Sequence, residues 1–171
     1  MTIEKTINSL RKLYAHGTRK IQCNEGYVYD SELIFYEPSS ASDISLLLES
    51  YSPLPEDYLK FLSITNGFRP FSEVPITGET DIFSIDEVLE INKHYVHPSM
   101  IMIACTNDDY LILDTKDVAQ GKSEYMYVIE GGGCPFEYAR SLYCDFQTWL
   151  DRFCMAQGNK YWTWRVEDRK F

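Results

Sequence analysis

The stretch LPEDYLKFLSITNG (residues 54–67) has the pattern of a short amphipathic helix. Pro55 suits the first helical turn, where its missing N–H costs nothing. Glu56 and Asp57 follow at the helix end where the dipole favours negative charge. The closing Asn-Gly pair supplies a left-handed residue that ends a helix. An apolar stripe at helical spacing predicts the buried face, which consists of Leu54, Tyr58, Phe61, Leu62 and Thr65.

The two acids at the start of this predicted helix are candidates for acid/base catalysis. Adjacent residues of an α-helix point about 100° apart, so Glu56 and Asp57 are poorly placed to share one substrate. Stabilisation of the helix N-terminus explains both better. The stretch therefore predicts buried structure rather than a reactive site.

Other periodic segments precede this helix. Residues 3–14 repeat apolar side chains at helical spacing, after a threonine cap and before a glycine stop. Residues 26–38 are rich in β-branched and aromatic side chains and predict one strand, or two short strands with a bend. Residues 44–51 predict a short helix capped by Ser42 or Asp43.

Strand and helix signals alternate after it. Residues 68–80 hold two prolines and a glycine and predict a loop. Residues 81–95 begin extended and continue as a helix, in which Ser84 and Glu87 have the spacing of a capping box. Two apolar runs around a polar turn predict a β-hairpin at residues 101–115.

The C-terminal third completes the pattern. Residues 124–130 predict another strand, a glycine-rich loop follows, and Asp145 caps a last amphipathic helix. The aromatic tail at residues 159–171 predicts an added edge strand or an interface patch. Helices flank a run of hairpin-linked strands, which predicts one α+β domain over residues 1–171, with a twisted, mostly antiparallel sheet flanked by helices.

The composition fits this expectation. The chain has 171 residues, of which 44% are hydrophobic, so it can bury one real core. Its apolar runs are far shorter than the roughly 18 residues that a membrane span needs. The N-terminal segment has no signal-peptide core, so the expected location is the cytoplasm. Five cysteines without CxxC spacing predict free, mostly buried thiols.

The acidic residues are unevenly distributed. The net charge is −10, and residues 21–59 hold eight acids and no lysine or arginine. Residues 70–92 hold six more acids, again without a base. Such a field repels a nucleic-acid backbone and attracts a basic partner. Acids that only keep the protein soluble are the alternative explanation.

No motif gives a strong signal for catalysis or metal binding. His94 and His97 lie three residues apart but belong to no HExxH pattern. The glycines at 131–133 lack the lysine and helix of a phosphate-binding loop, and sequence alone assigns no base to Cys134. The hairpin carboxylates fit turn and strand-end positions as well as a metal cluster; they are Asp108, Asp109 and Asp114. We therefore expect no catalytic residue, metal or cofactor.

The order of these segments resembles the SUKH superfamily. Its signature is a hydrophobic-acidic helix, leucine-proline, a tyrosine-bearing helix and a closing asparagine-glycine, which ISLLLESYSPLPEDYLKFLSITNGF (44–68) matches. Residues 82–92 look like its strand-then-helix element, 101–115 like its central hairpin and 144–153 like its last helix. The resemblance covers about residues 40–155. The hairpin turn departs from the family's frequent Gly-Asp, and the segments outside this range are where specificity of this member is expected.

The resemblance implies an α+β fold without catalytic activity. Most bacterial members are immunity proteins that neutralise a cognate polymorphic toxin, often a nuclease, and the toxins include the LXG type. The expected partner is the C-terminal domain of such a toxin, a basic protein, with no nucleic acid or membrane involved; a homodimer is compatible with this. An intracellular scaffold with the same fold is the alternative, and an enzyme using Cys134 or Asp114 is the third hypothesis.

A nuclease inhibitor must cover a basic cleft that normally holds phosphates. Acidic side chains imitate those phosphates and steer association, while exposed tyrosine and tryptophan supply anchors. Association is expected to weaken steeply with salt. The candidate toxin-binding residues are the acids Glu32, Glu37, Glu73, Glu79 and Asp81, with the aromatic residues Tyr29, Tyr36 and Trp162.

Overall fold

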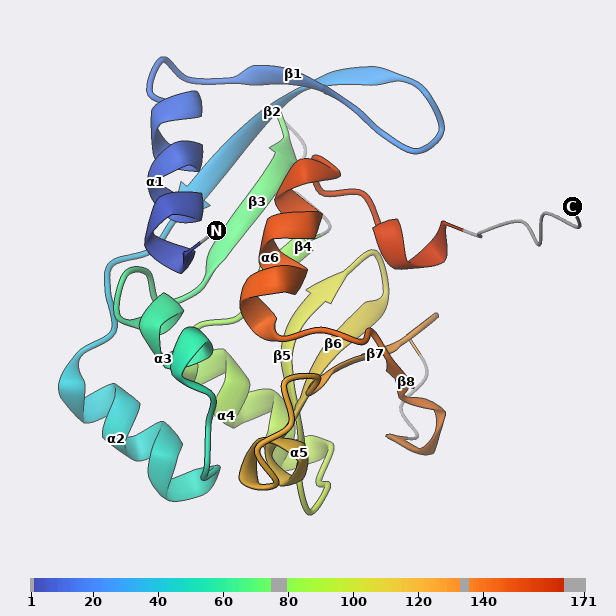
Figure 1. The fold of residues 1–171 in the computed structure, drawn as a ribbon. Helices are drawn as coiled ribbons and strands as arrows, with labels where there is room; N and C mark the ends of the chain where they lie inside the picture. The colour runs from blue at the N-terminus through green and yellow to red at the C-terminus, as the bar shows by residue number, and fades with distance from the viewer. Residues whose placement is uncertain (1, 75–79, 133–135, 165–171) are drawn as a thin grey trace, which may run out of the picture.

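The computed structural model describes residues 2–74, 80–132 and 136–164 (Figure 1). Within these ranges an eight-stranded antiparallel sheet pairs each strand with its neighbours in the sequence. The strands are β1 (Arg19–Gln22), β2 (Val28–Phe35), β3 (Phe68–Glu73), β4 (Thr80–Ile82), β5 (Met100–Thr106), β6 (Asp109–Asp114), β7 (Met126–Ile129) and β8 (Arg140–Ser141). The predicted α+β class with an antiparallel sheet is confirmed.

Helices flank this sheet, as the sequence predicts. The α-helices are α1 (Ile3–Leu13), α2 (Ala41–Ser50), α3 (Glu56–Leu62), α4 (Ile85–His94), α5 (Thr115–Ala119) and α6 (Phe146–Met155), and the 3-10 turns are η1 (Phe136–Tyr138) and η2 (Tyr161–Thr163). Helix α6 crosses the front of the sheet beside α1 and α3, while α4 packs on β5 and α2 packs on α4 (Figure 1). None of the described helices is long and apolar enough to cross a membrane.

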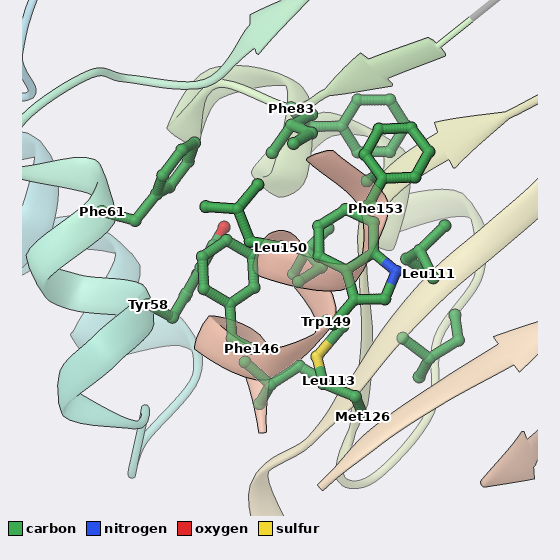
Figure 2. Packing of buried hydrophobic residues seen from close by; sticks show 14 of the residues in the cluster. Tyr58, Phe61, Phe83, Leu111, Leu113, Met126, Phe146, Trp149, Leu150 and Phe153 are labelled. Atoms are coloured by element: carbon green, nitrogen blue, oxygen red, sulfur yellow. The ribbon is translucent and has the colours of Figure 1, made fainter. Parts of the chain in front are cut away.

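Aromatic side chains of α3 and α6 form the centre of the core. Figure 2 shows Phe146, Trp149 and Phe153 of α6 lying between α3 and the strands. The rings of Tyr58 and Phe61 each pack 5.1 Å from that of Phe146, centroid to centroid. All five side chains are fully buried. The apolar stripe predicted in residues 54–67 is therefore the inner face of α3.

Local capping signals set the starts of α4 and α2. Ser84 and Glu87 exchange side-chain and backbone hydrogen bonds at the start of α4, so the predicted capping box is confirmed. Helix α2 begins with a second capping box, formed by Ser40 and Asp43. The prediction that Ser42 or Asp43 caps α2 is therefore wrong, because Ser40 already satisfies the first free N–H groups.

Strand β3 occupies the first half of the segment 68–80, for which the sequence predicts a loop. Pro70 lies inside this strand although it has no N–H to donate. The pairing of β2 with β3 shifts register between Glu32 and Ile34, so two residues of β3 oppose one of β2. Pro70 and Phe71 form this bulge, and Phe71 has a φ of 55°. The bulge explains why a proline is tolerated here.

The Asn-Gly pair at the end of the opening stretch lies beyond α3, which already ends at Leu62, and contacts the start of α4 instead. Gly67 has a φ of +82° and lies against the β4–α4 connection. A Cβ at this position would clash with the carbonyl oxygen of Ile82 and lie 2.7 Å from the nitrogen of Ser84. The Asn66 side chain accepts the N–H of Ile85 at 2.9 Å. The pair thus fixes α4 next to α3.

Candidate functional site

A hollow of about 540 Å³ opens at one end of the sheet. The β1–β2 turn, the end of β3, the β5–β6 turn and the segment after α6 surround it. In Figure 1 the blue β1–β2 turn lies above the red segment that follows α6. The volume falls in the range of about 300–1,000 Å³ that is typical of ligand sites. Its charged and aromatic lining residues are Glu25, Tyr27, Tyr29, Phe71, Glu73 and Lys160.

Two tyrosines form the aromatic wall of the hollow. The rings of Tyr27 and Tyr29 lie 6.1 Å apart, centroid to centroid, and are tilted by 45°. The hydroxyl of Tyr29 donates to the carbonyl of Phe71 at 3.3 Å, which fixes this ring. Burial raises the pKa of Tyr29 to about 12, and the charge of Glu73 acts in the same direction. Tyr27 is 55% exposed, so its ring is available to a partner.

Two carboxylates stand beside these rings. Glu25 belongs to the β1–β2 turn, and Glu73 is the last residue of β3. Neither forms an ion pair with another residue of the described ranges. A hydrogen bond from Cys23 lowers the pKa of Glu25, so this group is ionised at neutral pH. The same cysteine raises the pKa of Tyr27, as do the nearby charges of Glu73 and Glu25.

The lysine in the lining is neutralised within the protein. The Nζ of Lys160 lies 3.0 Å from the carboxylate of Asp109 and also donates to the carbonyl of Asn107. The side chain of Asp109 is only 4% exposed. It also accepts the indole N–H of Trp162 and the backbone N–H of Gly131, each at 3.0 Å. We call Asp109, Lys160 and Trp162 the C-terminal clasp, because they fasten the segment after α6 to the β5–β6 hairpin.

Three of the predicted site residues lie at or beside the hollow. Tyr29 and Glu73 line it. Trp162 lies next to it, with its indole held by Asp109 and its ring stacked 6.1 Å from that of Phe153. The prediction of an edge strand in the tail is wrong for residues 161–163, which form the turn η2. The clasp joins residues far apart in the sequence and holds this segment against the β5–β6 hairpin.

The other predicted residues lie elsewhere. Arg69 pairs with Asp81 at 3.0 Å, and burial followed by the charge of Asp81 raises the pKa of Tyr36. Tyr36 and Asp81 thus form a second group. Glu32 is half-buried in β2 and Glu37 is exposed after it; Glu79 lies outside the described residues.

Sequence reasoning missed most of the hollow. It assigned no strand to residues 19–22, since RKIQ contains one apolar side chain. It therefore missed the β1–β2 turn with Glu25 and Tyr27. The signal was the turn sequence Asn24-Glu25-Gly26, where Gly26 adopts a φ of +89°.

The remaining candidates for chemistry have structural roles where they are described. Asp114 caps α5 by accepting the N–H of Lys116 at 2.9 Å, and Asp109 belongs to the clasp. The Nδ1 of His97 accepts two backbone N–H groups. No three His, Cys, Asp or Glu side chains in the described part of the chain converge to hold a metal ion. Cys134 lies outside that part.

Asp57 also has a structural role, beyond that predicted for it. Its carboxylate accepts the hydroxyl of Tyr125 at 2.6 Å and the backbone N–H groups of Tyr58 and Gln147 at 2.8 Å each. Burial raises the pKa of Asp57, and these hydrogen bonds act against that rise. Because Gln147 lies in the first turn of α6, Asp57 serves the N-termini of two helices. Both oxygens of this carboxylate already accept hydrogen bonds, which argues against a role of Asp57 in acid/base catalysis.

The sequence model of the SMI1/KNR4 family (SUKH-1) matches residues 38–152. The chain belongs to this family. It is similar to the uncharacterized protein YobM of Bacillus subtilis (strain 168), with 30% identity over 95% of the chain and 92% of YobM. The SUKH-1 match includes Phe71 and Glu73 but excludes Glu25, Tyr27, Tyr29 and Lys160. The hollow is thus built mostly from segments beside the family core.

Proposed function

We propose that this SUKH-1 protein is a cytoplasmic immunity protein, which binds a cognate polymorphic toxin and covers its basic active site. The observation that carries the proposal is the hollow, where two acids that form no ion pair within the described residues stand beside two tyrosines. It is formed largely by segments outside the family match, where recognition of one particular partner is best accommodated.

The electrostatics of this region suit a basic partner. Lys160, the only lysine among the described residues of the lining, is already paired with Asp109, so the charge that these residues present is negative. A negative surface speeds the approach of a basic protein and selects against acidic ones. Nuclease active sites are basic because they hold phosphates, and this favours a nuclease-type toxin.

The proposed mode of action is occlusion without catalysis. We place Tyr29 and Glu73 in the interface, together with Tyr27 and Glu25, and extend it over the group of Tyr36 and Asp81 and over Glu32, Glu37, Glu79 and Trp162. The candidate catalytic groups Asp57 and Asp114 are engaged in helix capping, which supports a binding role.

Co-expression with the toxin domain encoded beside this gene tests the proposal. Cells that carry the toxin domain and this protein are expected to survive, and the two proteins should co-purify. An inactive toxin variant serves as the control for expression. Cell death despite folded, abundant protein, without co-purification, contradicts the proposal and favours a scaffold that binds another partner.

A further inference from the structure

The two rings in the hollow form a surface suited to a cation. Tyr27 and Tyr29 lie 6.1 Å apart with a tilt of 45°, and both rings line the hollow. Aromatic faces attract cations within about 6 Å of the ring centroid. Tyr29 is held in place by its hydrogen bond to Phe71, so this ring needs little reorganisation to accept a ligand.

The charges around the rings select a cation over other ligands. Glu25 and Glu73 both line the hollow and lie near the hydroxyl of Tyr27. They disfavour phosphate-bearing ligands, and no metal-binding group of three side chains forms in the described residues. The ammonium of Lys160 does not oppose a second cation, because Asp109 compensates its charge.

We propose that this hollow binds an arginine side chain of the protein partner, with the guanidinium against Tyr27 and Tyr29 and paired with Glu25 and Glu73. A planar guanidinium stacks on a ring and forms two hydrogen bonds to a carboxylate at the same time, which an ammonium does not. The volume of about 540 Å³ also admits the backbone beside the arginine. The identity of the partner as a toxin rests on the proposed function. The binding of an arginine side chain by the hollow is argued independently of it.

A peptide titration tests the arginine site without the toxin. The isotope-labelled full chain is titrated with a capped pentapeptide that carries one arginine between glycines, and the backbone amide shifts are followed by NMR. The control peptide carries citrulline, which has nearly the same shape and no charge. We expect the arginine peptide to shift the amide signals around residues 25–29, 73 and 158–160. The citrulline peptide should bind about tenfold more weakly, and the same peptide with lysine should bind with an affinity between the two.

Matched variants separate a specific site from the general negative charge of the protein. Glu25→Gln with Glu73→Gln should weaken arginine-peptide binding about tenfold, because both charged partners are lost. The control pair, Glu49→Gln with Glu56→Gln, removes the same charge from exposed positions on α2 and α3 and should change it less than about twofold. Tyr27→Ala should weaken binding about fivefold while the spectrum stays that of a folded protein.

Three results overturn the inference: no shifts at the hollow, equal binding of arginine and citrulline peptides, or equal loss in both pairs of variants. If the survival assay fails but the arginine peptide still binds, the arginine site stands and only the toxin is excluded as the partner. Conversely, survival conferred equally well by the Glu25→Gln/Glu73→Gln protein, with no arginine-peptide binding by the unmodified chain, retains the immunity function and removes the arginine site.

Discussion

At the residue scale, Asp57 shows how one carboxylate connects parts of the chain far apart in sequence. It lies in the first turn of α3 and accepts hydrogen bonds from Tyr125 and from Gln147 of α6. A local pattern explains the acid at the start of α3 but not its bonds to residues 68 and 90 positions away. Its role in the core therefore appears only in the folded structure.

Asp57→Asn is expected to lower the free energy of unfolding by about 1–3 kcal/mol, because the amide has one acceptor oxygen for three donors. Urea denaturation followed by circular dichroism measures this. The matched control is Glu56→Gln at the adjacent exposed position, which should change stability by less than about 0.5 kcal/mol. Equal effects of the two changes would show that Asp57 acts only through the helix dipole.

Gly67 is the second residue on which the opening stretch depends. Gly67→Ala should destabilise the protein by roughly 2–5 kcal/mol, since the added Cβ meets the β4–α4 backbone and the φ is positive. Gly121 also has a positive φ but has open space around it, so Gly121→Ala should cost only about 1–2 kcal/mol. Thermal unfolding of both variants compares the two losses of stability. Equal losses would show that the contact between Gly67 and the β4–α4 backbone does not contribute.

At the scale of elements, the segment after α6 depends on the C-terminal clasp. The aromatic residues of this segment are evident in the sequence. Asp109, which accepts the indole N–H of Trp162, lies more than 50 positions earlier, in β6. The segment is a wall of the hollow through Asn159 and Lys160. The clasp thus links the stability of this segment to the shape of the site.

Asp109→Asn should release this segment, because Lys160 loses its buried counter-charge. We expect faster hydrogen exchange at residues 160–164 and a loss of about 3 kcal/mol in unfolding free energy. Asp108→Asn, at the neighbouring exposed position of the turn, is the control. Unchanged exchange in the Asp109 variant would show that other contacts hold the segment without the clasp, among them the stacking of Trp162 on Phe153 and the hydrogen bond of Asn159 to Gln22.

Elements whose signals are local were predictable from the sequence. The caps at Ser84 and Asp145 and the 101–115 hairpin are confirmed because their determinants lie within a few residues. Strand β3 was not predictable, since Pro70 is tolerated only through the bulge against β2. Of the candidate site, Tyr29 and Glu73 were selected from composition, but the turn that brings them next to Glu25 was not.

At the scale of the whole molecule, alkaline pH should weaken the fold. Burial raises the pKa of Tyr29 to about 12, and a hydrogen bond to Asp117 followed by burial does the same for Tyr127. Unfolded tyrosines titrate near pH 10, so between pH 10 and 12 the folded chain retains more protons. The free energy of unfolding must then fall as the pH rises through this range.

Urea midpoints at a series of pH values from about 9 to 11.5 measure this fall. The variant Tyr29→Phe/Tyr127→Phe should show a shallower decline, because two of the groups responsible are absent. A midpoint that is constant or rises over this range would show that the two hydroxyls ionise equally easily in both states.

We propose that the acidic end of the sheet neutralises a toxin by occupying its active site. The most direct measurement titrates the purified toxin domain of the neighbouring gene with the purified full chain and follows residual toxin activity. We predict that activity falls to background at a one-to-one ratio and that association slows as salt is raised. Full toxin activity at a several-fold molar excess of this protein would show that it does not neutralise the toxin.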